Sequence, residues 1–243
     1  MPSYSLRLFQ VFGITVFLHW SWFLIAALWI YQPSQYQDYP LLWSTAECLG
    51  FFILVLVQSI GTSLGCRSVG GKAMDITLWP LGTMADFTPP QRPGAVLWTF
   101  LSGSLLSLLV AIILLTCFYY TGTYEAIFVT KQPITSPQRF LTFITVGNLF
   151  ILIFNLLPVY PLSGGQIARA LLWYGVGRWR SLQIAAGIGA LACLAGIGYS
   201  MPNKQYFLIL VCCFGVYMSF TAYQFANYML QNPHLNPDDA QSY

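Results

Sequence analysis

Very few side chains in this sequence could bind a metal ion or act as a catalytic base. Histidine occurs only at His19 and His234, and the 243 residues include seven carboxylates. His19 lies inside an apolar stretch, whereas His234 lies in a polar tail. A histidine-rich site therefore cannot be assembled within one chain. We expect a structural role for His19, because a lone polar side chain in an apolar segment usually packs inward against a partner.

Two further side chains, Ser163 and Cys66, belong to reactive types, but each has a simpler structural explanation. Ser163 precedes two glycines, so a serine nucleophile can be imagined, but no sequence feature brings His19 to it. Cys66 lies two helical turns after Gln58, and a single thiol in an apolar setting is more often packed than reactive. The six cysteines show no paired loop spacing, which favours packing over a disulfide or zinc framework.

The composition indicates a membrane protein with several spans. Only 7% of the residues are charged, 57% are hydrophobic, and the mean hydropathy is +0.64, whereas an ordinary soluble domain has about 25% charged residues. The ten cations are scattered singly and form no basic patch, so we expect the lipid bilayer as a partner and no nucleic acid.

Apolar stretches of about 20 residues, the length needed to cross the hydrocarbon core, predict an all-α polytopic protein with six transmembrane helices. We expect one membrane-embedded domain over residues 1–232 and a short polar cytoplasmic tail over 233–243. Glycine and alanine in the fifth span should let a neighbouring helix approach closely. The predicted spans are 11–31, 41–64, 95–121, 140–157, 182–199 and 206–230.

The cations predict the orientation of these spans, because cytoplasmic loops carry the excess of lysine and arginine. Both termini are therefore expected in the cytoplasm, in an integral protein of the cell membrane. On the amino-terminal side lie Arg7, Arg67, Lys72, Arg92, Arg169, Arg178 and Arg180, and on the other side Lys131, Arg139 and Lys204.

Two segments on the predicted cytoplasmic side do not resemble ordinary loops. Residues 65–93 contain "DITLWPLGTMADF", whose β-branched residues predict a short re-entrant strand or hairpin. Residues 158–180 begin with prolines and glycines that should break the fourth span before a short helix resumes at Gln166. Irregular backbone near a bilayer is tolerated only where protein or a wet cavity surrounds it, so we expect a buried site here.

The order of four motifs resembles the site-2 proteases, zinc metalloproteases that cut transmembrane helices inside the bilayer. The motifs are "GITVFLHWSWFL", "DITLWPLG", "SGSLLSLL" and "NLFILIFNLLPVYPLSGGQIARALLW", and the resemblance covers roughly residues 13–175. It implies a site-2-protease-like helical core.

The resemblance also implies a metal site whose residues have changed. In the family, an H-E-x-x-H motif supplies two zinc ligands and a glutamate that activates the metal-bound water. Here Gln58, Ser59 and Thr62 stand at those positions. The aspartate of the family's L-D-G motif, its third ligand, is replaced by Ser163. We therefore expect no catalytic residue and no zinc or other cofactor.

The resemblance further places a substrate beside the broken fourth span. The family pattern persists there at Asn155, Pro158, Pro161 and Gly164, which are the expected substrate-binding residues. The leading hypothesis is thus an inactive pseudoprotease that binds or regulates transmembrane segments of client proteins. One alternative is an active zinc protease with displaced ligands, which would need His19, Cys66 and a carboxylate. A second alternative is a transporter, because a broken helix and a re-entrant loop also suit transport.

Overall fold

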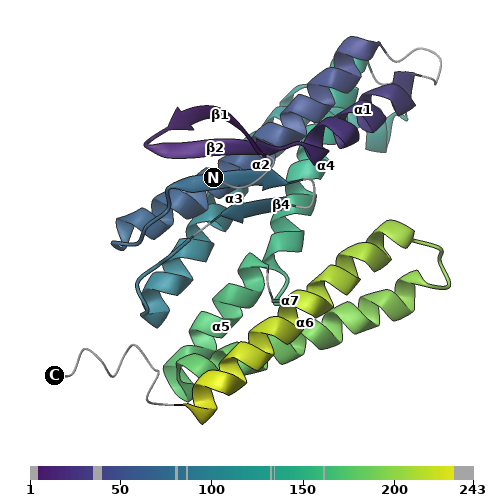
Figure 1. Cartoon of the computed structure of the whole chain (residues 1–243). Coiled ribbons are helices and arrows are strands. Elements are labelled where there is room, and N and C mark those ends of the chain that lie inside the picture. The colour runs from purple at the N-terminus through teal and green to yellow at the C-terminus, as the bar shows by residue number, and fades with distance from the viewer. Residues whose placement is uncertain are drawn as a thin grey trace. The chain divides into compact units, whose positions relative to one another are not determined.

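The computed structural model describes residues 5–34, 40–79, 82–85, 87–131, 133, 135–160 and 162–232. Tertiary packing divides the chain into two compact units (Figure 1). Unit 1 comprises Met1–Pro89 and Ser102–Phe154, and unit 2 comprises Pro90–Leu101 and Asn155–Tyr243. The elements are β1 (Ser5–Val11), β2 (Ile14–His19), α1 (Ser21–Ser34), α2 (Leu41–Ser68), β3 (Asp75–Trp79), β4 (Gly82–Ala85), α3 (Pro93–Tyr120), the π-helix η1 (Glu125–Val129), α4 (Ser136–Leu156), α5 (Ser163–Val176), α6 (Arg178–Ser200) and α7 (Tyr206–Gln231).

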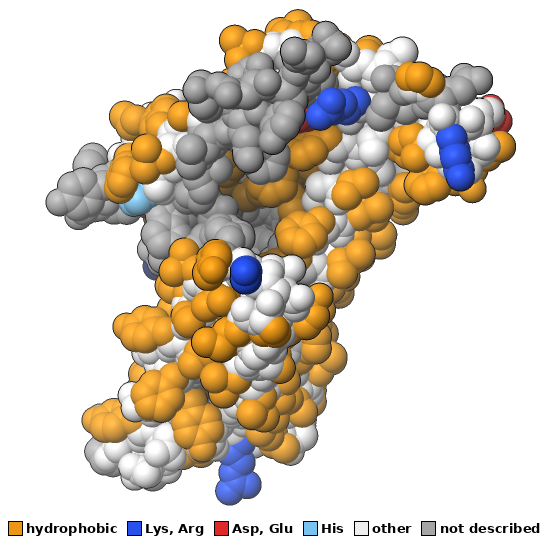
Figure 2. Space-filling view, turned by 90° about the vertical axis from the view of Figure 1, so that its right-hand side faces the viewer, with side chains coloured by type: hydrophobic (Ala, Val, Ile, Leu, Met, Phe, Trp, Pro, Cys, Tyr) orange, Lys and Arg blue, Asp and Glu red, His pale blue; other side chains and the backbone are white. Residues whose placement is uncertain are grey.

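Five of the described helices are long and apolar enough to cross a membrane: α2, α3, α4, α6 and residues Leu208–Gln231 of α7. They agree with the second to sixth predicted spans. On the face shown in Figure 2, hydrophobic side chains cover much of the described surface, with few charged ones between them. This surface suits lipid rather than water, and the protein is an integral membrane protein.

The first predicted span, residues 11–31, is wrong in its first half. Residues Ile14–His19 form strand β2, and α1 contains only 14 residues. Side chains along β2 alternate between buried and half-buried, which is the period of a strand. A tight turn at Phe12 and Gly13, both with positive φ, folds β1 back onto β2. An apolar run by itself cannot distinguish this arrangement from one helix.

The four strands form one sheet in the order β1-β2-β3-β4. β2 pairs in parallel with β3, with Val16 opposite Ile76, and β3 pairs antiparallel with β4, with Thr77 opposite Met84. The strand pair predicted from "DITLWPLGTMADF" is therefore confirmed. The continuation of the sheet into the amino-terminal hairpin was not predicted, because parallel pairing across 60 positions leaves no local signal.

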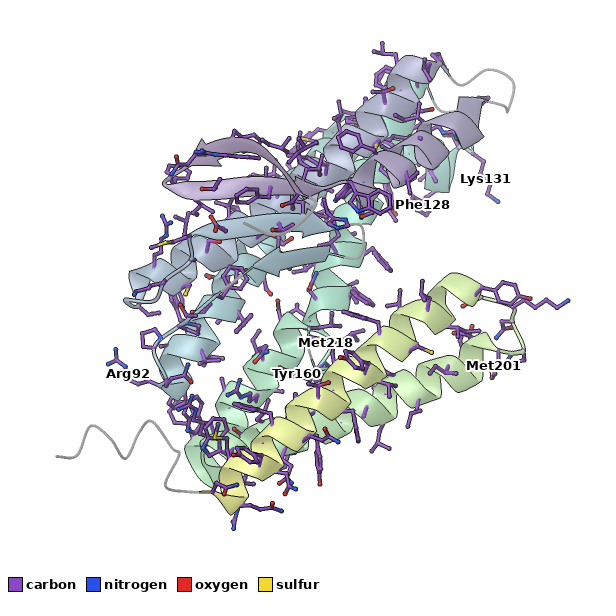
Figure 3. All side chains as sticks on the ribbon, viewed as in Figure 1. Arg92, Phe128, Lys131, Tyr160, Met201 and Met218 are labelled. Carbon is purple, nitrogen blue, oxygen red and sulfur yellow. The ribbon has the colours of Figure 1, made fainter. Side chains whose placement is uncertain are left out.

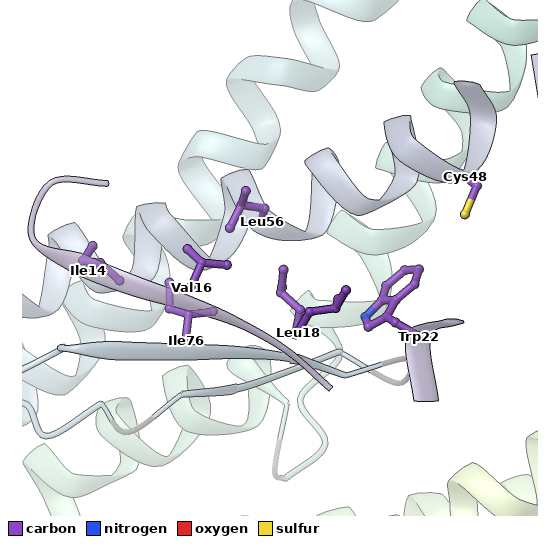
Figure 4. Close-up of a cluster of buried hydrophobic side chains, with 8 residues drawn as sticks. Ile14, Val16, Leu18, Trp22, Cys48, Leu56 and Ile76 are labelled. Atoms are coloured by element: carbon purple, nitrogen blue, oxygen red, sulfur yellow. The ribbon is translucent and has the colours of Figure 1, made fainter. Parts of the chain in front are cut away.

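The core of unit 1 lies between this sheet and α2. Figure 4 shows Ile14, Val16 and Leu18 of β2 facing Leu56 of α2, with Trp22 farther along the chain near Cys48. Arg67, near the end of α2, contacts the start of β2, so β2 and α1 run antiparallel to α2. The six strand residues and 14 helix residues together extend for about 40 Å, enough to cross a hydrocarbon core of about 30 Å.

Unit 2 is built on the antiparallel pair of α6 and α7. A Cβ on Gly196 would lie 2.7 Å from the Cys212 sulfur, and one on Gly215 would lie 2.5 Å from the Cys193 sulfur. The two helices can therefore approach closely only because each offers a glycine to the cysteine of the other. The predicted close approach along the fifth span is confirmed.

Candidate functional site

The three changed positions of the second span lie on α2 in unit 1, and all are buried. Gln58, Ser59 and Thr62 are 8%, 4% and 5% exposed. Gln58 and Thr62 are one helical turn apart and so share a face of the helix. The Ser59 hydroxyl donates a hydrogen bond of 2.9 Å to the Val55 carbonyl, and the Thr62 hydroxyl donates one of 3.2 Å to the Gln58 carbonyl. Both hydroxyl protons are thus used within the helix.

The same stretch of α2 packs tightly on α3. A Cβ on Gly103 would collide with the Thr62 hydroxyl oxygen, and it would lie 2.9 Å from the Gln58 carbonyl oxygen. A Cβ on Gly61 would lie 3.1 Å from the Gly103 Cα atom. The Ser102 hydroxyl also donates a hydrogen bond of 3.0 Å to the Gly61 carbonyl. Thr62, where the resemblance places a zinc ligand, is therefore part of a close contact between two helices.

A second buried polar contact joins α3 to α4. Asn148 is 1% exposed, and its amide donates a hydrogen bond of 3.0 Å to the Ser107 carbonyl. The Ser107 hydroxyl lies 3.4 Å from the Asn148 Oδ1 atom. Neither residue of this pair is among the site residues predicted from the sequence. An asparagine in the middle of an apolar span is the signal that could have indicated it, because such a side chain needs a partner on a neighbouring helix.

The break in the fourth span lies where it was predicted. Helix α4 ends at Leu156, and α5 begins at Ser163. Asn155 is half-buried, Pro158 is exposed, and Pro161 lies outside the described residues. Gly164 is buried, and a Cβ there would collide with the carbonyl oxygens of the residues that end α4. Gly164 thus allows close backbone packing and has no side chain to offer a substrate.

The break is anchored on the α6 and α7 pair within unit 2. The Ser219 hydroxyl donates a hydrogen bond of 2.9 Å to the Tyr160 carbonyl, and a Cβ on Gly189 would lie 2.7 Å from the same carbonyl oxygen. Figure 3 shows Tyr160 beside Met218, which precedes Ser219 in α7. The irregular backbone is therefore held by hydrogen bonding and by close contact with two long helices.

The residues needed for a displaced metal site do not come together. His19 lies at the end of β2, with its Nδ1 atom 2.6 Å from the Ser21 hydroxyl oxygen. Cys66 is next to Arg67 in α2. Arg67 donates a hydrogen bond to the Gly13 carbonyl, at the opposite end of β2 from His19. The strand extends for about 20 Å between those ends. Among the described residues, no three histidine, cysteine, aspartate or glutamate side chains gather as a metal site would require.

Comparisons with known proteins identify the relationship. The model of peptidase family M50 matches residues 124–196. A zinc metalloprotease of Methanocaldococcus jannaschii is 29% identical over 212 residues, covering 87% of this chain and 58% of the relative. The solved structure of the site-2 protease from the same organism has a TM-score of 0.66 and 26% identity, and the match covers 90% of this chain and 95% of that one.

The chain is similar in sequence and in fold to the site-2 proteases of peptidase family M50. The putative zinc metalloprotease Rip3 of Mycobacterium tuberculosis is 25% identical over 201 residues, covering 76% of this chain and 47% of Rip3. The chain thus spans about half the length of the curated relatives it matches. The site-2-protease-like helical fold expected from the motifs is confirmed.

The side chains at the family's metal positions do not fit a catalytic zinc. A zinc ion of this kind needs imidazole, thiolate or carboxylate ligands. This site-2 protease relative has amide and hydroxyl groups at Gln58, Thr62 and Ser163. The Thr62 hydroxyl also faces Gly103 at the close contact of α2 with α3. The donor set and the local packing therefore both argue against zinc.

Proposed function

We propose that this protein is a catalytically inactive member of the site-2 protease family that binds transmembrane segments of client proteins without cutting them. The observation that carries the proposal is the hydrogen bonding of the Ser59 and Thr62 side chains. At the positions of the family's general base and second histidine, their hydroxyls donate to carbonyls within α2. Neither side chain can supply what hydrolysis inside a membrane requires.

The chemistry supports inactivity at each step. Neutral oxygen donors hold zinc weakly compared with imidazole and carboxylate. A general base should have a pKa near the working pH, and an ordinary serine hydroxyl does not ionise there. One substitution could exchange a ligand, but the changes at Gln58, Ser59, Thr62 and Ser163 remove every component together.

An edge of the sheet supports the binding half of the proposal. Strand β4 is the last strand in the order β1-β2-β3-β4, so it has a strand neighbour on one side only among the described residues. It also packs against α2, the helix that carries Gln58 and Thr62. An extended peptide can add to such an edge through main-chain hydrogen bonds, which need no catalytic residue.

The orientation is proposed together with the function. Because β2 and α1 are together long enough to cross the bilayer along α2, the chain makes six crossings with five long helices. An even number of crossings places the carboxyl terminus on the same side of the membrane as the amino terminus. We propose that both termini are cytoplasmic, in the cell membrane, as the distribution of lysine and arginine favours.

The test is site-specific photo-crosslinking to a model transmembrane client in membranes. A photoreactive side chain at position 84 in β4 is compared with one at position 8 in the other edge strand, β1. We expect uncleaved client crosslinked through position 84 and much less through position 8. Cleaved client, or equal crosslinking from both positions, would contradict the proposal.

A gain-of-function variant shows what else has changed. Gln58→His, Ser59→Glu, Thr62→His and Ser163→Asp together restore the family's ligand and base types. Zinc-dependent cleavage by this variant would support the view that only the metal site was lost. Inactivity of a folded variant would show that the binding region has changed as well.

A further inference from the structure

Unit 2 has an unusual charge balance for a membrane-embedded body. Its described residues include five cations and no aspartate or glutamate. A cation removed from water is costly unless an anion or a set of acceptors compensates it. The five cations are Arg92, Arg169, Arg178, Arg180 and Lys204.

Two of these arginines lie around the same tryptophan. The guanidinium carbon of Arg169, on α5, is 5.8 Å from the centre of the Trp173 ring, and that of Arg178, at the start of α6, is also 5.8 Å from it. Arg178 lies 4.3 Å from the centre of the Trp179 ring as well. These cation–π contacts bring two like charges close to the same ring.

Arg169 still has hydrogen-bonding capacity to satisfy. One terminal nitrogen donates a hydrogen bond of 3.3 Å to the Gln166 side chain, while the buried Nε atom has no acceptor among the described residues. Burial lowers the pKa of Arg169; Tyr160 opposes this shift, and the charge of Arg178 adds to it. A buried donor of this kind calls for an acceptor, and a negatively charged one would relieve both problems.

The two arginines lie where lipid headgroups are found. Helix α6 is long enough to span the membrane and begins at Arg178, so its first turn lies at a membrane surface. A Cβ on Gly94, in the first turn of α3, would lie 3.1 Å from the Tyr174 hydroxyl oxygen near the end of α5. Arg92, labelled in Figure 3, immediately precedes α3 and therefore lies near the same end of unit 2.

The geometry points to a binding site for the phosphate of an anionic phospholipid headgroup, formed by Arg169 and Arg178 and flanked by Trp173 and Trp179. Two guanidinium groups can donate paired hydrogen bonds to phosphate oxygens, and tryptophan favours the boundary between headgroups and acyl chains. Exposed apolar side chains of α5, among them Leu171 and Val176, offer a surface for the acyl chains.

The direct test measures lipid binding by native mass spectrometry on the purified full chain. Phosphatidylglycerol is titrated against phosphatidylcholine for the wild type and for Arg169→Gln/Arg178→Gln. The control, Arg180→Gln/Lys204→Gln, has the same net charge but leaves the two arginines in place. We expect the first pair of substitutions to weaken phosphatidylglycerol binding at least about tenfold more than the control pair. Equal weakening by both pairs would overturn the site.

A conservative variant controls for misfolding, and two further measurements distinguish a lipid headgroup from other anions. Arg169→Lys/Arg178→Lys keeps the charge but loses the paired donors, so it should bind less phosphatidylglycerol than the control pair while retaining the fold. Millimolar inorganic phosphate should not displace the lipid; displacement would show a site for free anions instead. If phosphatidylglycerol binds only after residues 233–243 are deleted, Asp238 and Asp239 of the tail are the occupants and the lipid assignment is wrong.

Discussion

The Thr62 hydroxyl oxygen lies against Gly103, so close that no Cβ could be added to that glycine. Thr62 belongs to α2 and Gly103 to α3, and their contact fixes the approach of two membrane-spanning helices. A position at which the resemblance to the site-2 proteases places a zinc ligand is here part of a helix interface. We propose that the framework of the site-2 proteases persists in this chain without their metal.

Substitution of Gly103 should disrupt this interface. Gly103→Ala is expected to destabilise the protein by about 1–3 kcal/mol, because the added methyl group overpacks the contact. Thr62→Ala in the same chain should recover part of the loss, since it removes the nearest atom, although the Gln58 carbonyl at 2.9 Å remains. The measurement is the thermal midpoint in detergent for both single variants and the double variant.

Gly187→Ala is the matched control, because a Cβ there meets nothing within 4 Å in the described structure. Its midpoint should stay the same or rise, since alanine favours a helix over glycine. A Gly103→Ala protein as stable as this control would show that the two helices are not in close contact.

Loss of the buried Asn148 amide should weaken the packing of α3 against α4. Asn148→Leu removes a donor to the Ser107 carbonyl and leaves the Ser107 hydroxyl without its partner on α4. We expect a loss of about 1–3 kcal/mol in the free energy of unfolding. Adding Ser107→Ala should cost less in the Asn148→Leu background than in the wild type. Additive losses in denaturant unfolding would argue that the pair does not interact.

The two glycines after Ser163 should be indispensable for folding of the break. Gly164→Ala would push a methyl group into the backbone at the end of α4, and Gly165→Ala would place one 2.5 Å from the Tyr160 nitrogen. Each variant should fail to yield monodisperse protein in size-exclusion chromatography. Gly175→Ala, on the same helix with open space around it, should behave as the wild type. Normal yields for the first two would mean that the break packs differently.

Removal of the Arg67 guanidinium should loosen the amino-terminal hairpin. Arg67 donates hydrogen bonds of 2.5, 2.9 and 2.8 Å to the carbonyls of Phe12, Gly13 and Ala73. Arg67→Gln should increase amide hydrogen exchange of residues 5–19 at least about tenfold, because several charge-assisted bonds worth about 1.5–3 kcal/mol each are weakened. Arg7→Gln, which removes an equal charge from an exposed side chain, should leave the exchange unchanged.

Much of this architecture could be predicted from single stretches of sequence. The hydropathy of α2 and α6 gave their positions, and Pro158 with Gly164 correctly indicated where α4 breaks. The strand over Ile14–His19 could not be predicted in this way, because its apolar run continues into α1 without interruption. Its identity as a strand depends on pairing with Asp75–Trp79, a partner far along the chain.

The candidate site shows the same limit. The residue types at positions 58, 59, 62 and 163 predict that the zinc ligands have changed. That Thr62 packs on Gly103, and that Asn148 bonds to Ser107, depends on how three helices lie against one another. Packing between spans is set by the complementarity of small and polar residues on different segments, which one sequence does not display.

Zinc content and proteolysis measured together test the central claim most directly. The full chain, purified without chelator and dialysed against micromolar zinc, is examined by elemental analysis and incubated with a model transmembrane substrate in liposomes. The site-2 protease of Methanocaldococcus jannaschii serves as the positive control. We predict far less than one zinc ion per chain and no product. Stoichiometric zinc, together with cleavage abolished by a chelator, would contradict the account.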